Sequence, residues 1–225
     1  MIGSVIKQLG DQLEALDWVE VYGGLVQTMR IRQGEAENEV YNVFPISCDV
    51  SEADCVSDQR YQDLVPNDSK RSILYFETLN GLQDVGPQKI GRGSTNRFRR
   101  VFRGAVRLVG WLNMQRLGVD ECYGADMAVR SIIKMLNNEY NVFPPGSLFE
   151  NGEIDFTIQR IVPKDHKVIF GRYNYLDSNG YWLYPFDFFA IDLSIRLILP
   201  LCDYDFPTNG IPIDPGECID NSRIL

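Results

Sequence analysis

The strongest constraint on the fold is a period-two pattern near residue 190. Six large apolar side chains fall on one side of that stretch: Phe189, Ile191, Leu193, Ile195, Leu197 and Leu199. The alternate positions are mostly small or polar: Ala190, Asp192, Ser194, Arg196 and Ile198. This alternation is typical of an antiparallel strand with one dry side. The chain therefore needs a sheet and a second layer that covers one of its faces.

Two other segments have the three- and four-residue spacing of amphipathic helices. Residues 1–16 place one apolar stripe at Ile2, Val5, Ile6, Leu9, Leu13 and Leu16. Residues 125–136 do the same with Ala125, Ala128, Val129, Ile132, Ile133 and Leu136. A helix with one apolar stripe buries it against another layer. The sequence therefore predicts an α+β fold in which two amphipathic helices pack on a mainly antiparallel sheet.

The remaining segments predict further strands and long connections. Strands are expected at 18–32 (either one strand or a short hairpin about Gly23 and Gly24), 40–50, 72–79, 98–114 and 154–159. Pro45 favours an edge position or a bulge for its strand. Polar, Gly-rich or Pro-rich composition predicts loop insertions at 51–70, 80–97 and 139–153, and an extended C-terminal arm at 201–225. We expect a single domain over residues 1–200.

Composition narrows the class of protein. The 225 residues carry a net charge of -9 and are 44% apolar, so the chain can form a core without metals or disulfides. Its apolar runs fall short of the roughly 18 residues that a membrane-spanning helix needs. The amino terminus lacks the basic start and apolar stretch of a secretory signal. We expect no membrane association, and synthesis and assembly in a reducing cytoplasm.

The residues that usually carry chemistry are sparse. Five cysteines at irregular spacings and the single histidine, His166, argue against a zinc site, a disulfide framework or a catalytic triad. Residues 86–95 have the glycine spacing of a phosphate-binding loop, but Arg92 replaces the required lysine and a strand follows. Paired acids such as Asp203 and Asp205 lie in the Pro-rich arm, which fixes no separation between them. We therefore expect no catalytic residues, no metal and no cofactor.

Positive charge is concentrated in one short segment of this acidic chain. Six arginines fall within sixteen positions: Arg92, Arg97, Arg99, Arg100, Arg103 and Arg107. Three interpretations stay open: contact with nucleic-acid phosphates, contact with an acidic patch on a second copy or a neighbour, and a solvated strand face with local salt bridges. The net negative charge argues against a dedicated nucleic-acid binder, but it suits a channel wall past which DNA slides.

A dense aromatic segment at 173–189 supports the rival function. It includes Tyr173, Tyr175, Tyr181, Trp182, Tyr184, Phe186, Phe188 and Phe189. Such a density suits packing in the core, a protein interface with Tyr181 and Trp182 as contact residues, or a carbohydrate platform. The alternative function is therefore a carbohydrate-binding or hydrolytic module that uses these rings with acids such as Asp177 and Asp187. A third alternative is a bacterial adaptor without ring symmetry.

The order of elements resembles the tail-terminator and neck proteins of tailed bacteriophages. The likeness lies in an amino-terminal helix that leads into strands, a long loop before a long strand (80–97, then 98–114), a second helix at 125–136 and closing strands. It covers residues 1–200, while the long insertions and the arm depart from the shorter family members. They leave open whether the chain is a terminator or another neck or tail ring.

This resemblance implies a structural virion protein without catalytic residues. Copies of the chain would form a homo-oligomeric ring, six- or twelvefold, in the neck or tail. The ring would join the tail to the head connector and its neighbouring neck and tail proteins, and would let genomic DNA pass without sequence recognition. On this basis we expect Arg97, Arg99, Arg100 and Arg103 to contact acidic surface on an adjacent subunit or the next ring.

Overall fold

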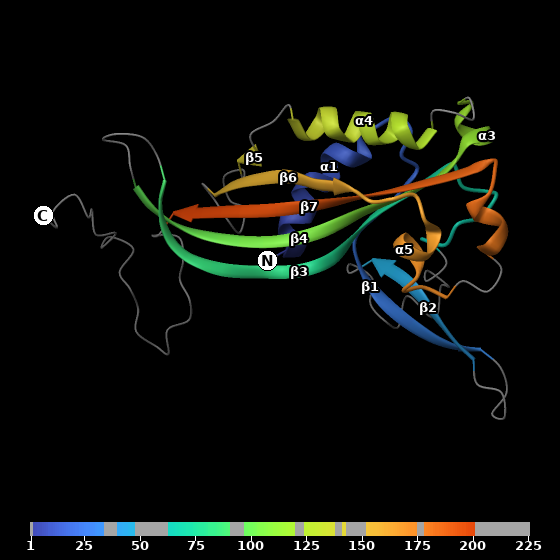
Figure 1. Ribbon diagram of the computed structural model, residues 1–225, viewed down its shortest axis with the longest axis horizontal. Helices are drawn as coiled ribbons and strands as arrows, with labels where there is room; N and C mark the ends of the chain where they lie inside the picture. Colours follow the sequence, from blue (N-terminus) through green and yellow to red (C-terminus); the bar gives the residue numbers. More distant parts are fainter. Residues whose placement is uncertain are drawn as a thin grey trace, which may run out of the picture.

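The computed structural model describes residues 2–33, 40–47, 63–90, 97–119, 124–137, 141–142, 152–174 and 178–200 (Figure 1). Its elements, in chain order, are α1 (Ile2–Glu14), β1 (Val21–Gln33), β2 (Val40–Ser47), β3 (Ser72–Ile90), β4 (Arg97–Asn113), α3 (Met114–Leu117), α4 (Gly124–Asn137), β5 (Asn141–Val142), β6 (Glu153–Ile161), α5 (His166–Phe170), the 3-10 helix η3 (Ser178–Trp182) and β7 (Phe186–Pro200).

The described strands form one mixed sheet in the order β2-β1-β3-β4-β7-β6-β5. Only the short β1–β3 contact is parallel, and the other neighbouring strands run antiparallel. A mixed sheet with a few helices agrees with the predicted class in its coarse form. The edge position that Pro45 predicts is also confirmed, because β2 is the last strand on its side.

One face of the sheet shares a hydrophobic core with the helices. Buried residues of α1, such as Leu9, and of α4, such as Ile132, belong to the same cluster as Leu108 of β4 and Leu193 of β7. The six alternating residues of β7 all lie in this cluster, as the period-two pattern predicts. Figure 1 shows α1 and α4 on the same side of the sheet. We call this side the helical face.

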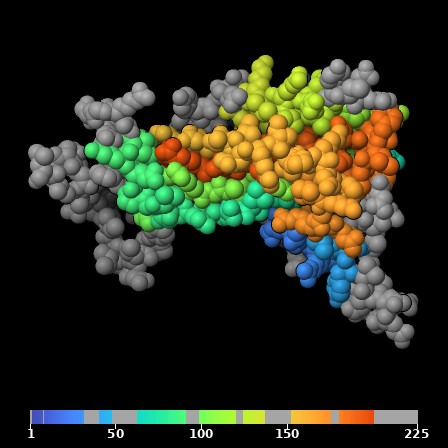
Figure 2. Space-filling view, in the orientation of Figure 1, coloured from blue at the N-terminus to red at the C-terminus, as the bar shows by residue number. Residues whose placement is uncertain are grey.

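The opposite face is covered near one end of the sheet by the chain that follows β6. Ile169 and Phe170 of α5 and the nearby Tyr173 form a second buried cluster with Trp111 of β4 and Phe188 of β7. Figure 2 shows this part of the chain in orange in front of the sheet. The sheet thus has a core on both faces at this end, which the sequence pattern alone did not predict.

The predicted loop at 80–97 is wrong for most of its length, because β3 continues to Ile90. Residues 80–90 pair with β4 up to the contact between Ile90 and Arg97. The register shifts three times along this pairing, and Gly86 adopts a φ of +88° that favours glycine. The glycines therefore form bulges within a strand. We call residues 78–90 of β3 and 97–105 of β4 the distal hairpin, which extends to the left in Figure 1.

The glycines at 23 and 24 also lie within a strand and make no hairpin turn. Gly24 has a φ of +62°, and the register of β1 with β3 shifts between Tyr22 and Leu25. A Cβ on Gly23 would lie 2.6 Å from the side chain of the buried Leu64, which would have to move to admit it. Beyond the bulge, β1 leaves β3 and pairs with β2.

Other expectations agree with the structure to within a few residues. The helix predicted at 125–136 is α4, and the strand predicted at 98–114 is β4. The Asn113 side chain caps α3, which ends at Gly118 with a φ of +65°. Residues 51–62 of the first predicted insertion, 143–151 of the third and the arm at 201–225 lie outside the described residues. No helix among the described residues has the length and apolar character needed to cross a membrane.

Candidate interaction surface

The predicted arginines of β4 divide between the two faces of the sheet. Arg99, Arg103 and Arg107 lie on the opposite face with the buried Trp111, because strand residues alternate. Arg100 lies on the other side. Arg97 opens β4 across from Ile90, and Arg92 is outside the described residues. The segment that looked like one basic stripe is therefore split by the pleat.

Two of these arginines have acidic partners within the chain. Arg99 forms an ion pair with Glu153 at the start of β6, and Arg100 pairs with Asp84 of β3. The hydrogen bond from Arg100, supported by the backbone N–H of Gly86, lowers the pKa of Asp84. Local salt bridges were one of the three interpretations of this segment, and they hold for this pair of residues. Their contact with a second copy stays a prediction.

Arg107 belongs to a charged row that crosses four strands on the opposite face. The row consists of Glu77 in β3, Arg107 in β4, Asp192 in β7 and Arg160 in β6, and the members of each neighbouring pair lie directly across from one another. Arg107 donates to Asp192 twice, with Nε–Oδ1 at 2.7 Å and Nη2–Oδ2 at 3.2 Å. Arg160 donates to the same carboxylate at 2.7 Å.

Both acids of the row are nearly inaccessible to solvent. Burial raises the pKa of Glu77, against the hydrogen bond that the Tyr173 hydroxyl donates at 2.7 Å and the charge of Arg172 at 3.3 Å. Burial opposes ionisation of Asp192 too, but the hydrogen bonds from Arg107 and then Arg160 outweigh it and lower that pKa. Since the side chain of Arg107 is only 12% exposed, this arginine neutralises Asp192 within the protein and presents little charge at the surface.

Arg103 lies four residues before Arg107 on the same face of β4, and its environment is different. It is exposed, and within the part of the chain that the structure describes it forms no ion pair. Its direct cross-strand neighbour on β7 is Arg196, a second positive charge. Arg196 meets Asp155 at 3.6 Å, and its Nε is buried without a hydrogen-bond partner among the described residues. Like charges placed directly across a sheet destabilise the pairing.

The aromatic segment is largely folded into the protein. Trp111 donates from Nε1 to the backbone oxygen of Tyr181 at 3.0 Å, and the two rings are 6.3 Å apart. Trp182 lies 4.4 Å from the ring of Phe170 and is stacked on His166 at 5.9 Å. Both predicted contact residues, Tyr181 and Trp182, are therefore half-buried members of the second cluster. Tyr175 and Asp177 lie outside the described residues.

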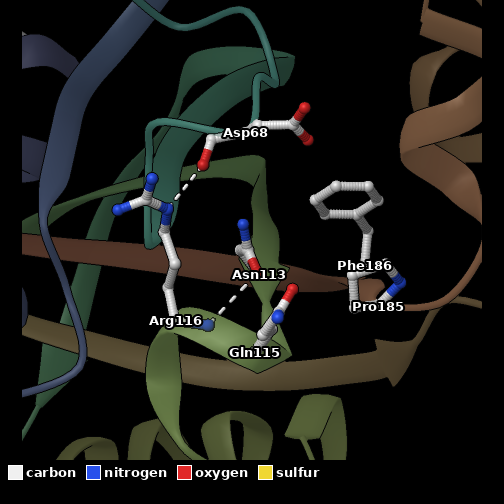
Figure 3. Close-up of a pocket in the computed structure, with 6 residues that line it drawn as sticks. All are labelled: Asp68, Asn113, Gln115, Arg116, Pro185 and Phe186. Carbon is white, nitrogen blue, oxygen red and sulfur yellow. Dashed lines mark hydrogen bonds between the residues drawn. The ribbon is translucent and has the colours of Figure 1, made fainter.

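A shallow cleft of about 570 Å³ lies at the end of β4 (Figure 3). It is lined by Asp68, Asn113, Gln115, Arg116, Pro185 and Phe186. Arg116 donates to the backbone oxygen of Asp68, and Asn113 accepts from the Arg116 backbone N–H at 3.3 Å. The Arg116 hydrogen bond connects α3 to the segment that precedes β3. The lining contains no cysteine, serine or histidine that could act as a nucleophile or base.

Several charged residues of the opposite face escaped the sequence analysis. Glu77, Arg160 and Arg172 were not predicted, and Asp192 was seen only as part of a polar face. The available signal was a charge inside an apolar strand, as in Tyr75-Phe76-Glu77-Thr78-Leu79.

Among the described residues, no group of three or more His, Cys, Asp or Glu side chains is placed to hold a metal ion. Comparisons with protein-family models, curated protein sequences and solved structures found no match.

Proposed function

We propose that this protein is a non-catalytic structural subunit that assembles into a homo-oligomeric ring. The ring belongs to the neck or tail of a tailed bacteriophage, where it joins the tail to the head connector around a DNA channel. Its body is an α+β domain with α1 and α4 packed on the helical face, and residues 201–225 form an extended arm. Neighbouring neck and tail proteins are its partners.

The observation that carries this proposal is the distal hairpin. Its residues on β3 are mostly exposed beyond Glu77, whereas the body of the same strand is buried from Ser72 to Glu77. A second hairpin, β1–β2, projects from the other end of the sheet (Figure 1). In a ring each subunit presents two different surfaces to its two neighbours, because the contact is head-to-tail. Two projecting hairpins at opposite ends of one body provide such surfaces.

The absence of catalytic roles is also part of the proposal. Each acid of the charged row is engaged by arginine or tyrosine side chains, which leaves Glu77 and Asp192 with structural tasks. The aromatic rings that a carbohydrate platform would need are largely packed against the sheet, with Tyr173 and Phe188 buried. We therefore prefer the assembly function to the carbohydrate-binding or hydrolytic alternative.

Electron microscopy of the purified full-length chain tests this proposal. Closed rings of about six or twelve subunits with an open centre are expected. Duplex DNA added to the rings should not be retained at physiological salt, since the chain is acidic overall. Particles without rotational symmetry, together with saturable binding of an oligosaccharide, would contradict the proposal and favour the alternative.

A further inference from the structure

The opposite face of the distal hairpin and of the adjoining ends of β7 and β6 carries a positive charge that the described residues leave unbalanced. Three arginines lie there, Arg99, Arg103 and Arg196, against the two acids Glu153 and Asp155. Glu153 is taken by Arg99. Only Asp155, 3.6 Å from Arg196, remains for the other two arginines. The surface around Arg103 and Arg196 therefore has one more positive charge than it can neutralise.

This pair differs in kind from the charged row nearby. In the row, each charge faces an opposite charge across the strands. At Arg103 and Arg196, two like charges face each other, and burial of the Arg196 Nε adds a donor without an acceptor among the described residues. Both features cost stability in the isolated chain. An acidic ligand that lies between the two arginines would relieve the like-charge repulsion.

The chain itself contains a segment of suitable charge. Residues 201–225, outside the described residues, hold five acidic side chains, Asp203, Asp205, Asp214, Glu217 and Asp220, against one base, Arg223. Three prolines, Pro207, Pro212 and Pro215, favour extended backbone over helix or sheet. The segment follows Pro200, which pairs with Arg99 at the end of β7 next to the arginine pair. The segment therefore begins at the same end of the sheet as the patch.

We propose that the surface around Arg103 and Arg196 binds the acidic segment 201–225 of a second copy of this chain. The segment is long enough to reach a second copy. Asp214 is 14 residues beyond Pro200, about 40 Å in extended form, whereas β3, the edge strand of the distal hairpin, is two strands or about 10 Å away from β7. This inference rests on the proposed function and identifies one contact of its ring.

Reciprocal charge reversal in the full-length chain tests the contact. The first variant, R103E/R196E, reverses the patch, and the second, D214K/E217K/D220K, reverses the segment. A matched control, R130E/K134E, makes the same charge change as the first variant at two exposed positions of α4. Self-association is measured by sedimentation velocity, and circular dichroism checks that each variant is folded. The second variant leaves every described residue unchanged, so it stays informative if the first does not fold.

Each reversal alone should weaken self-association at least tenfold, while the control should match the wild type. Mixing the two variants should restore association, because the acidic segment of one fits the unaltered patch of the other. Wild-type association in either variant, or no recovery on mixing, would overturn the inference. Recovery only when both reversals are placed in one chain would show a contact within that chain, and would also overturn it. So would loss of duplex-DNA binding in R103E/R196E with assembly intact, because phosphates would then be the ligand.

Further outcomes distinguish a failure of the docking contact from a failure of the proposed ring. Rings that persist in electron micrographs of both variants would defeat the docking and leave the proposed function standing. Patch-dependent dimers that never close into rings would support the docking contact and contradict the proposed function. A wild-type chain that stays monomeric at every concentration would contradict the docking between copies, whatever the variants do.

Discussion

The two ends of β3 and β4 differ sharply although they belong to the same pair of strands. At one end both faces are covered: Phe76 and Leu108 join the helical core, and Tyr75 and Trp111 join the aromatic cluster beneath α5. At the other end the distal hairpin exposes much of β3 and carries Arg103 against Arg196. The covered end supplies stability, and the distal end is the surface that we assign to assembly.

The charged row marks the boundary between these two ends. Asp192 and Glu77 lie next to the aromatic cluster, and Tyr173 and Arg172 connect the chain after α5 to Glu77. Beyond the row, the opposite face carries Arg103 and Arg196, although Val101 and Ile198 on the same face are buried. Charge thus has different roles on either side of it: balanced and buried within the body, unbalanced and exposed on the distal hairpin.

Trp111→Ala should have the largest effect, because it removes a ring that is 1% exposed in the middle of the aromatic cluster. A buried tryptophan truncated to alanine lowers the free energy of unfolding by about 3–5 kcal/mol. Urea denaturation followed by circular dichroism measures it. Leu183→Ala, at a side chain that is 69% exposed, is the control and should change the free energy by less than about 0.5 kcal/mol. Equal losses in the two variants would mean that the cluster is not a core.

Asp192→Ala should lower the free energy of unfolding by about 3 kcal/mol, because it leaves the guanidinium of Arg107, whose side chain is only 12% exposed, without this carboxylate. Arg160 contributes less, since its side chain is 61% exposed and stays solvated. The control is Asp155→Ala on β6, where the pair with Arg196 is long and exposed. It should cost less than about 0.5 kcal/mol. A small loss of unfolding free energy in Asp192→Ala would mean that the charged row does not stabilise the boundary between the two ends of β3 and β4.

The two buried acids should respond to pH in opposite directions. The raised pKa of Glu77 means that the folded state holds this proton more tightly than the unfolded state, so its stabilising contribution is lost as pH rises through the folded pKa. The lowered pKa of Asp192 gives a contribution that is present at neutral pH and lost as pH falls.

Unfolding free energies measured from about pH 3 to about pH 7 test this pair of signs. Glu77→Gln should gain stability relative to the wild type as pH rises over this range. Asp192→Asn should be less stable than the wild type at neutral pH, and the gap should narrow as pH falls. If the difference in unfolding free energy between variant and wild type changed with pH in the same direction for both variants, the assigned pKa shifts would be contradicted.

Arg103→Ala should have the smallest effect on folding. The side chain is exposed, and its neighbour across the strands is another arginine, so its removal should change the free energy of unfolding by less than about 0.5 kcal/mol and in the stabilising direction. Arg107→Ala, four residues along the same strand, is the natural comparison and should cost several times more. Similar losses in both variants would erase the difference between the two ends of β4.

The elements with a clear period could be predicted from the sequence. The stripe from Val5 to Leu13 and the alternation from Phe189 to Leu199 are buried as the patterns require, because each pattern leaves one arrangement that hides its apolar side. The distal hairpin was missed because Gly81, Gly86 and Pro87 are typical turn residues. In the structure they lie in a bulged edge, where β4 supplies the pairing that local sequence cannot reveal.

The interaction surface was predicted only in part, because cross-strand register decides which charges meet. Arg99, Arg103 and Arg107 lie together in one short segment of the sequence. Register places Arg107 against Asp192, and Arg103 against Arg196, a residue 93 positions away that no local pattern connects to it. The cover on the opposite face was equally hidden, since the aromatic residues that form it have no regular spacing. Tertiary pairing, and not residue type, separates the structural arginines from the exposed one.

The most direct test of the proposed assembly is the mass of the purified full-length protein by light scattering, at two protein concentrations and two salt concentrations. The account predicts a closed oligomer of about six or twelve 25.7 kDa subunits at low salt, and a smaller mass at high salt because screening weakens the charge contacts of the distal hairpin. A mass of one subunit under all four conditions would contradict it.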